Sequence, residues 1–246
     1  MSGPLLVEVT RAGLVESLHE VDAVVVDTSG RIVEAWGDAS RPVMPRSAIK
    51  PIQALPLLST GAADAFHLTD VELALACASH GGEPAHVDAV AGWLARLGLD
   101  AADLACGAQV PMNASAAAAV AAAGTDATAA YNNCSGKHTG FLTILRHLGL
   151  PLDGYVDPTH PLQADHITPS IERTCGVDLA AAHPGVDGCG IPVWSMPLDR
   201  LARGWATIGG EPEGSPAQRL LSAMRNEPFL VAGSSRACTR LIRKAT

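Results

Sequence analysis

The first 36 residues alternate between hydrophobic and polar positions, and a helical spacing of apolar residues follows. Four short β-prone runs cover residues 5–10, 14–19, 23–27 and 31–36. Gly13 and the Ser29-Gly30 pair interrupt these runs with the residues that tight turns favour. Short turns between neighbouring strands produce antiparallel hairpins, so we predict an antiparallel sheet at the start of the chain.

From Pro45 onward, apolar residues recur at the three- to four-residue spacing of helices that bury one face. We expect helices over residues 46–58, 69–78, 84–97, 113–123, 136–148, 161–175, 198–208, 216–226 and 235–243, with one further strand over 191–196. Thr69 and Glu72 have the spacing of a capping box. The alanine-rich segment 113–123 is expected to be closely packed.

Strands that come first and helices that follow indicate an α+β architecture, with helices flanking an antiparallel sheet. No linker or internal repeat divides residues 1–246, which are therefore expected to form one domain. No strands follow the last expected helix, so the N-terminal sheet is expected to keep an open edge.

Composition narrows the classes of function. The net charge is −8 and no cluster of Lys and Arg follows the chain, which argues against a nucleic-acid partner. No signal peptide and no apolar run of about 18 residues is present, so we expect a cytoplasmic protein without a membrane partner. The 6 cysteines are widely spaced, which favours free thiols or metal ligands over a disulfide framework.

Lysine is scarce, and this directs attention to its positions. Only Lys50, Lys137 and Lys244 are lysines among 17 basic residues. Arginine cannot lose its proton in a protein, so a neutral amine that acts as a base or binds a metal has to be lysine. Ser47 and Lys50 are three residues apart, the spacing at which a helix brings a hydroxyl to a basic amine. The alternative is a solvated lysine on a surface helix.

Three further segments concentrate reactive groups. Ser79, in a Ser-His-Gly-Gly corner after an apolar helix, presents either a hydroxyl to a cleft or an ordinary helix C-cap. Cys134 and Lys137 precede another helix, and Cys189 lies in a tight glycine turn. Two thiolates and a neutral lysine nitrogen could hold zinc with one position open, and the alternative is a pair of unrelated buried thiols.

Together these segments resemble the rhizobial-type L-asparaginases, the asparaginase II family. The resemblance is carried by PRSAIKPIQALPL at 45–57, LACASHGGEPAHV at 75–87, YNNCSGKHTGFL at 131–142, GYVDPTHPLQ at 154–163 and GVDGCGIPVWSMPL at 185–198. Their order and spacing agree over nearly the whole chain. The resemblance implies a fold similar to serine β-lactamases and penicillin-binding proteins, a homodimer, and hydrolysis of L-asparagine to L-aspartate and ammonia.

The resemblance also implies roles for individual residues. Ser47 with Lys50 forms a first Ser–Lys tandem, and Ser79 is the serine of a second. Cys134, Lys137 and Cys189 are implied zinc ligands beside the active site, and the zinc helps to bind or orient the substrate. His138 and Asp187 are implied to support the site. Which serine attacks the amide is left open.

Asparagine is a zwitterion, so its site needs a cation for the carboxylate and an acidic group for the ammonium. Arg46 and Glu83 are the candidates for these two roles. A hydroxyl activated by neutral lysine would attack the amide carbonyl, and backbone N–H groups would stabilise the oxyanion.

In the family, the lysine partner of the second serine lies in a C-terminal segment beyond residue 246, and Lys244 does not replace it. The resemblance therefore implies a chain that lacks this segment and its strands, with weak or no activity and a tendency to aggregate. Two other functions are kept as alternatives. One is a β-lactamase-like amidase or esterase with another substrate. The other is a non-catalytic zinc-binding protein that retains the fold.

Overall fold

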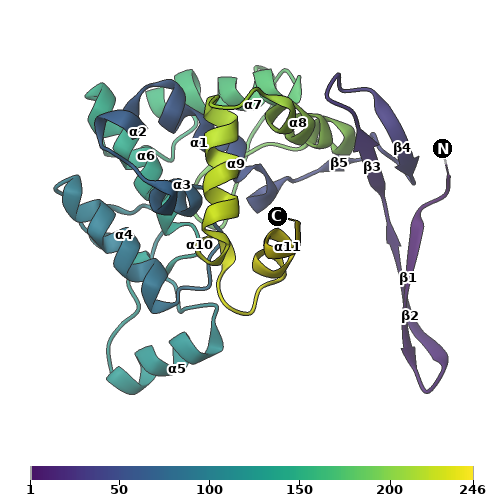
Figure 1. The fold of residues 1–246 in the computed structure, drawn as a ribbon, viewed down its shortest axis with the longest axis horizontal. Helices are drawn as coiled ribbons and strands as arrows, with labels where there is room; N and C mark the ends of the chain where they lie inside the picture. Colours follow the sequence, from purple (N-terminus) through teal and green to yellow (C-terminus); the bar gives the residue numbers. More distant parts are fainter. Residues whose placement is uncertain (1, 246) are drawn as a thin grey trace.

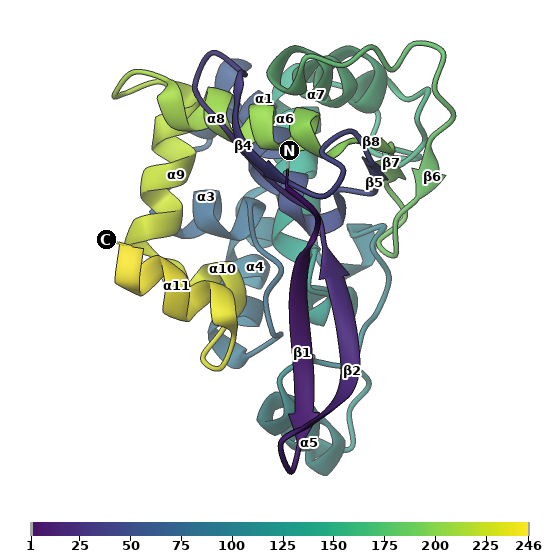
Figure 2. The same cartoon turned by 90° about the vertical axis from the view of Figure 1, so that its right-hand side faces the viewer.

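The N-terminal strands form two antiparallel hairpins, as their alternating pattern predicts. In the computed structural model, which describes residues 2–245, β1 (Leu5–Arg11) pairs with β2 (Leu14–Val21), and β3 (Ala23–Val26) pairs with β4 (Ile32–Trp36). Figure 1 shows the β1–β2 hairpin apart from the helical body, and Figure 2 shows it in front of the body, on the side that faces the viewer. All residues of its two strands are exposed. Strand β3 packs against helix α8 (Leu198–Gly210).

The other strands are short and pair with segments distant in sequence. Strand β5 (Pro42–Val43) pairs with β8 (Met196–Pro197), and β6 (Gly185–Val186) pairs with β7 (Pro192–Val193). The strand expected over 191–196 is therefore two strands in different sheets, because its two ends find different partners. The strands of residues 2–245 form four separate two-stranded sheets. The β-lactamase-like arrangement stays a prediction.

Helices make up most of the body. Those not yet named are α1 (Lys50–Ser59), α2 (Ala62–Ala65), α3 (Asp70–Ala76), α4 (Pro84–Arg96), α5 (Ala114–Ala123), α6 (Ser135–Leu148), α7 (Thr168–Cys175), α9 (Pro216–Asn226), α10 (Pro228–Ala232) and α11 (Ala237–Ala245). The capping box predicted for Thr69 and Glu72 is confirmed at the start of α3. Helices α2 and α10 had no periodic signal because each is only about one turn long.

Two predicted helices begin irregularly. The segment 46–58 starts with a 3-10 turn, η1 (Arg46–Ile49), in which Arg46 has a φ of 48°. The segment 161–175 starts with a π-helical turn, η4 (Leu162–Ile167), before α7 continues it. Two further 3-10 turns, η2 (Ala101–Asp103) and η3 (Ala129–Tyr131), lie in the connections on either side of α5.

The expectation that the alanine-rich helix is closely packed is wrong. Ala116 is the one residue of α5 that is buried. The helix forms because alanine has the highest helix propensity and both ends are capped, by the Asn113 side chain and by Gly124 at a φ of 64°. Alanine content here reflects local propensity and not close contact with the core.

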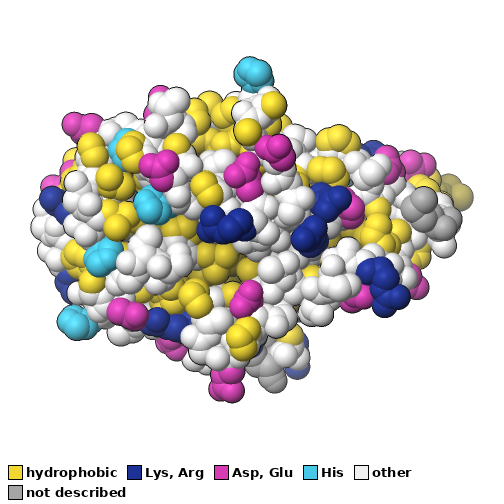
Figure 3. Space-filling view, turned by 90° about the horizontal axis from the view of Figure 1, so that it is seen from above, with side chains coloured by type: hydrophobic (Ala, Val, Ile, Leu, Met, Phe, Trp, Pro, Cys, Tyr) yellow, Lys and Arg dark blue, Asp and Glu magenta, His cyan; other side chains and the backbone are white. Residues whose placement is uncertain are grey.

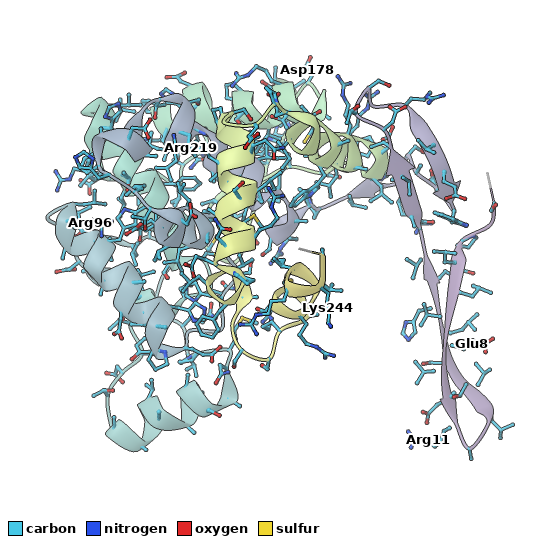
Figure 4. The ribbon with its side chains drawn as sticks, viewed as in Figure 1. Glu8, Arg11, Arg96, Asp178, Arg219 and Lys244 are labelled. Atoms are coloured by element: carbon cyan, nitrogen blue, oxygen red, sulfur yellow. The ribbon has the colours of Figure 1, made fainter. Side chains whose placement is uncertain are left out.

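Helix α1 occupies the centre of the body. It packs against α3, α6, α7 and α9, and its buried residues include Lys50, Ile52 and Leu57. Ion pairs join neighbouring helices: Arg96 binds Glu72 at 2.5 Å, and Arg219 binds Asp64 at 2.9 Å. The two arginines are labelled in Figure 4. Lys50, at the start of α1, therefore lies inside the packed helices.

The surface has a mixed character. On the face seen in Figure 3, basic side chains are dispersed among acidic and hydrophobic ones. Within residues 2–245, no helix combines the length and the hydrophobicity needed to cross a bilayer.

Glycine at position 136 allows α3 and α6 to approach each other closely. A Cβ atom built there would lie against the Leu75 backbone, with its carbonyl oxygen nearer than any real contact and its carbonyl carbon at 2.7 Å. The end of α3, close to Ser79, and the start of α6, next to Cys134, therefore lie against each other at Gly136. Only glycine fits between them.

We therefore predict that Gly136→Ala lowers the free energy of unfolding by about 1–3 kcal/mol, because two backbones would have to separate. Gly92→Ala is the matched control, since Gly92 lies within α4 and a Cβ there would meet nothing within 4 Å. The control should raise stability by about 0.5–1 kcal/mol through helix propensity. Urea unfolding measures both, and equal stability of the two variants would contradict the close approach.

Candidate active site

The amine of Lys50 is buried at the start of the central helix. Its side chain is 1% exposed, and its Nζ contacts the carbonyl oxygen of Ala78. The same nitrogen lies 2.8 Å from Ser79 Oγ and 3.5 Å from the carbonyl oxygen of Asn133. Burial is the largest influence on its pKa, which lies below the ordinary lysine value. The negative charge of Cys134 opposes this shift, and the positive charge of Lys137 adds to it. The amine therefore gives up its proton more readily than a solvated lysine does, and it lies beside a hydroxyl.

Ser79 and Ser47 have different relations to this lysine. Ser79 is half-buried, and its backbone N–H donates to the Val231 carbonyl at 3.0 Å. Ser47 is exposed, and its carbonyl accepts the backbone N–H of Lys50. Within residues 2–245, no hydrogen bond joins the Ser47 hydroxyl to Lys50. The lysine is thus paired with the serine 29 residues away in sequence.

Both serines border one cavity of about 620 Å³. Its wall is mainly apolar and comes from α1, α9, α10 and α11, including Leu221, Met224 and Val231. A cavity of this size is in the range of small-molecule sites. Two hydroxyls, one of them beside a buried amine, therefore face a space large enough for a ligand.

The predicted zinc ligands lie together. Lys137 is 2% exposed, and its Nζ lies 3.1 Å from Cys189 Sγ. Cys134 and Cys189 are joined by a side-chain hydrogen bond, and both are buried. The Asn132 side chain accepts the backbone N–H of Cys134 at 2.9 Å and so fixes the start of α6. The two thiols and the lysine are therefore neighbours inside the protein.

The hydrogen bond between the two thiols shifts their pKa values in opposite directions. The hydrogen bond from Cys189, with the nearby charges of Lys50 and Lys137, lowers the pKa of Cys134 to about 5. The hydrogen bond with Cys134 and burial raise the pKa of Cys189. The pair therefore favours a thiolate on Cys134 beside two lysines.

Those donors suit a metal ion in their chemistry. Thiolate sulfur and a neutral amine nitrogen are ligands that zinc accepts. Within the described residues 2–245, no group of three or more His, Cys, Asp and Glu side chains is arranged to hold a metal ion. The predicted set has lysine as its third donor, so its zinc stays a prediction.

Arg46 and Asp187 form an ion pair at the edge of the site. Arg46 Nη2 lies 2.9 Å from Asp187 Oδ1, and the Asp187 side chain is 11% exposed. The same oxygen accepts the Gly188 backbone N–H at 2.7 Å. The tight turn predicted after Asp187 is present, with Gly190 at a φ of 88°. Neither Arg46 nor Asp187 borders the cavity of the two serines.

Glu83 is engaged by backbone and side-chain donors. It caps α4 through a capping box with His86, and its two oxygens accept Ser234 N and Ser234 Oγ, each at 2.8 Å. It does not line the cavity. This carboxylate connects the Ser79 corner to the loop before α11, and its role toward a substrate ammonium stays a prediction.

Two buried histidines are held neutral near the site. His138 Nδ1 lies 2.7 Å from the Tyr155 hydroxyl, which also accepts the Ala105 backbone N–H at 2.9 Å. His80 Nε2 lies 2.9 Å from Ser135 Oγ. Burial is the main reason that the pKa of each imidazole is well below its ordinary value. His138 thus supports α6 as a neutral hydrogen-bond partner.

Three residues of the cavity wall were not predicted as site residues from the sequence, although Asn133 lies in the motif at 131–142. Trp205 donates from Nε1 to the Ala48 carbonyl at 3.0 Å, which fixes the turn that carries Ser47. Asn133 offers its carbonyl to Lys50, and Arg236 lines the cavity from the loop before α11. Their positions depend on contacts distant in sequence, which spacing does not reveal.

The arrangement combines a hydroxyl, a buried amine and a ligand-sized cavity, which suits nucleophilic attack on a carbonyl group. In a comparison with protein families, residues 7–246 match the family described as L-asparaginase II. A comparison with curated proteins finds no match.

Proposed function

Because the chain belongs to the L-asparaginase II family, we propose that it hydrolyses L-asparagine to L-aspartate and ammonia, with Ser79 as nucleophile and Lys50 as its base. One observation carries the assignment of roles: the buried Lys50 Nζ lies 2.8 Å from Ser79 Oγ at the wall of the cavity. Lysine is a competent base only when it is neutral, and burial favours that form.

The reaction proceeds by transfer of the side-chain acyl group. Lys50 Nζ accepts the Ser79 hydroxyl proton as Oγ bonds to the amide carbon. Backbone N–H groups stabilise the oxyanion. The C–N bond then breaks, and the lysine returns the proton to the departing ammonia. Water hydrolyses the resulting ester, which releases aspartate and restores the hydroxyl.

Ser47 has a different role from Ser79 in this scheme. It borders the same cavity from the turn before α1, and the family resemblance pairs it with Lys50. An exposed hydroxyl without a contact to the amine is less activated than Ser79. We therefore place Ser47 beside the substrate, where it can hydrogen-bond to the amide or to the hydrolytic water.

Zinc binding by Cys134, Lys137 and Cys189 completes the proposal. Bound zinc would supply a positive charge beside the active site that helps to hold and orient the substrate. Lys50 interacts with Cys134, so the thiol cluster and the catalytic amine are neighbours. Arg46 and Asp187, joined at 2.9 Å, support the Cys189 turn. The role of Arg46 toward the substrate carboxylate stays a prediction.

The size of the cavity favours a second candidate function. About 620 Å³ is more space than asparagine fills, and the wall is mainly apolar. An amidase or esterase that acts on bulkier substrates would use the same serine and lysine. Turnover of nitrocefin or simple esters, with none of asparagine, would support it.

We also propose a homodimer that covers the β1–β2 hairpin. A two-stranded hairpin is marginally stable alone, and here it extends from the body with apolar side chains in water. Leu5 is 41% exposed, Val7 51% and Val9 43%. Figure 4 shows Glu8 and Arg11 on the same hairpin, remote from the helices.

The first prediction concerns catalysis. The purified chain should release ammonia from L-asparagine, and Ser79→Ala or Lys50→Met should lower kcat by about 100-fold or more, because the nucleophile or its base is lost. Ser47→Ala should have a smaller effect. Ser17→Ala, on the remote hairpin, is the control and should keep full activity.

Two outcomes of that assay would contradict the proposal. Absence of ammonia release by the wild-type chain would contradict the proposed function. Loss of activity in Ser47→Ala together with retention in Ser79→Ala would make Ser47 the nucleophile. Circular dichroism of each variant separates lost chemistry from lost folding.

The second prediction concerns the metal. The purified chain should bind about one zinc ion, since three protein ligands gather at one place. Removal by a chelator should lower the melting temperature, because a metal that binds the folded state stabilises it. Cys134→Ser and Cys189→Ser should each reduce the zinc content measured by mass spectrometry, and Cys238→Ser is the exposed-thiol control. Undiminished zinc in both variants would exclude this site.

The third prediction concerns assembly. Sedimentation equilibrium should detect a dimer that Val7→Lys weakens, because the substitution places a charge on an apolar strand face. Glu8→Lys is the matched control on the opposite face, and the dimer should persist. A monomeric wild-type chain, or a dimer indifferent to Val7→Lys, would refute the assignment of the hairpin.

A further inference from the structure

The cavity of the two serines contains basic but no acidic side chains. Its polar lining consists of Ser47, Ser79, Asn133, Arg225, Arg236 and two cysteines, and none of its lining residues is Asp or Glu. An anionic group inside it would therefore meet positive charge without a competing carboxylate. The question is which arginine is placed to bind such a group.

Arg236 is the half-buried arginine of the two, and it has no acidic partner. Its Nη1 contacts Met112 Sδ at 3.9 Å, and within residues 2–245 its guanidinium forms no ion pair. A thioether is a weak acceptor, so most donors of the guanidinium are available to water or to a ligand. By contrast, Arg46, Arg96 and Arg219 each bind a carboxylate.

The loop that carries Arg236 is fixed relative to Ser79. Ser234 N and Oγ both donate to the Glu83 carboxylate at 2.8 Å, four residues after Ser79. On the other side, Thr239 Oγ1 donates to the Gly233 carbonyl at 2.6 Å. These hydrogen bonds fix the backbone that carries Arg236, so less of the loop has to be ordered when a ligand binds.

Other cations are less suitable, including the earlier candidate Arg46, which is paired with Asp187 and does not line the cavity. Lys50 is engaged by Ala78 and Ser79, and its proposed role requires the neutral form. Arg225 is exposed and donates to Ser222 Oγ at 3.2 Å, so water screens it at the edge of the cavity. The half-buried guanidinium is the one whose charge an anionic ligand would compensate most.

We propose that Arg236 binds the α-carboxylate of the substrate and so restricts the site to amides that carry a carboxylate. The inference rests on the proposed function, because it names the group that holds asparagine beside Ser79. The planar guanidinium can donate two parallel hydrogen bonds to a carboxylate. The side-chain amide of the same molecule is then free to reach the serine.

A pair of matched substrates tests this role. β-Alaninamide is asparagine without its α-carboxylate, so it keeps the reactive amide and loses the group that Arg236 binds. Arg236→Gln should lower the ratio of kcat/KM for asparagine to that for β-alaninamide by about tenfold or more, mainly through KM. Arg236→Lys should recover part of the ratio, because it keeps the charge without the two-pronged geometry.

Arg225→Gln is the control variant, and its ratio should equal that of the wild-type protein. Equal losses on both substrates in Arg236→Gln would show a structural role and overturn the proposal. A fall of the ratio in Arg225→Gln but not in Arg236→Gln would overturn it as well. Succinamate, which keeps the carboxylate and lacks the ammonium, should behave like asparagine.

Binding of L-aspartate, measured by calorimetry, tests the role of Arg236 independently of the proposed function. If the wild-type chain releases no ammonia, the proposed function fails, and binding still tests Arg236. Binding that Arg236→Gln weakens about tenfold or more supports the carboxylate site. Absent binding to the wild-type chain, or equal binding to both, overturns it.

Discussion

The site depends on one constraint, the burial of an amine at the start of the central helix. Lys50 is packed inside the protein, so its nitrogen must find polar partners or lose its proton. Its partners come from the segment after α3, through Ala78 and Ser79, and from the segment before α6, through Asn133. One side chain thus joins three elements and places a hydroxyl beside a base.

The thiol cluster extends this constraint. Lys137 contacts Cys189, and the charges of both buried lysines, Lys50 and Lys137, act on Cys134. A thiolate there stabilises neighbouring ammonium groups, whereas burial opposes them. Zinc at the cluster would keep the thiolates and change this balance, which couples the proposed metal site to the state of the proposed base.

Local features of the fold could be predicted from the sequence, and distant pairings could not. Hairpins and caps, such as the Thr69–Glu72 box, depend on residues close in the chain. The segment 113–123 was correctly predicted as a helix, but its exposure was not, since alanine suits both a packed and a solvated face. Spacing paired Lys50 with Ser47, whereas the long lysine side chain reaches Ser79. Arg236 gave no signal because an absent counter-charge is visible only in three dimensions.

The most direct test of the account is to trap the acyl-enzyme. The protein is mixed with L-asparagine, quenched in acid within the steady state, digested, and the peptides are fragmented in a mass spectrometer. The account predicts an aspartyl ester on Ser79, and its absence when Lys50 is replaced by methionine. An ester on Ser47, or release of ammonia with no ester on either serine, would contradict the central claim that the buried lysine activates Ser79.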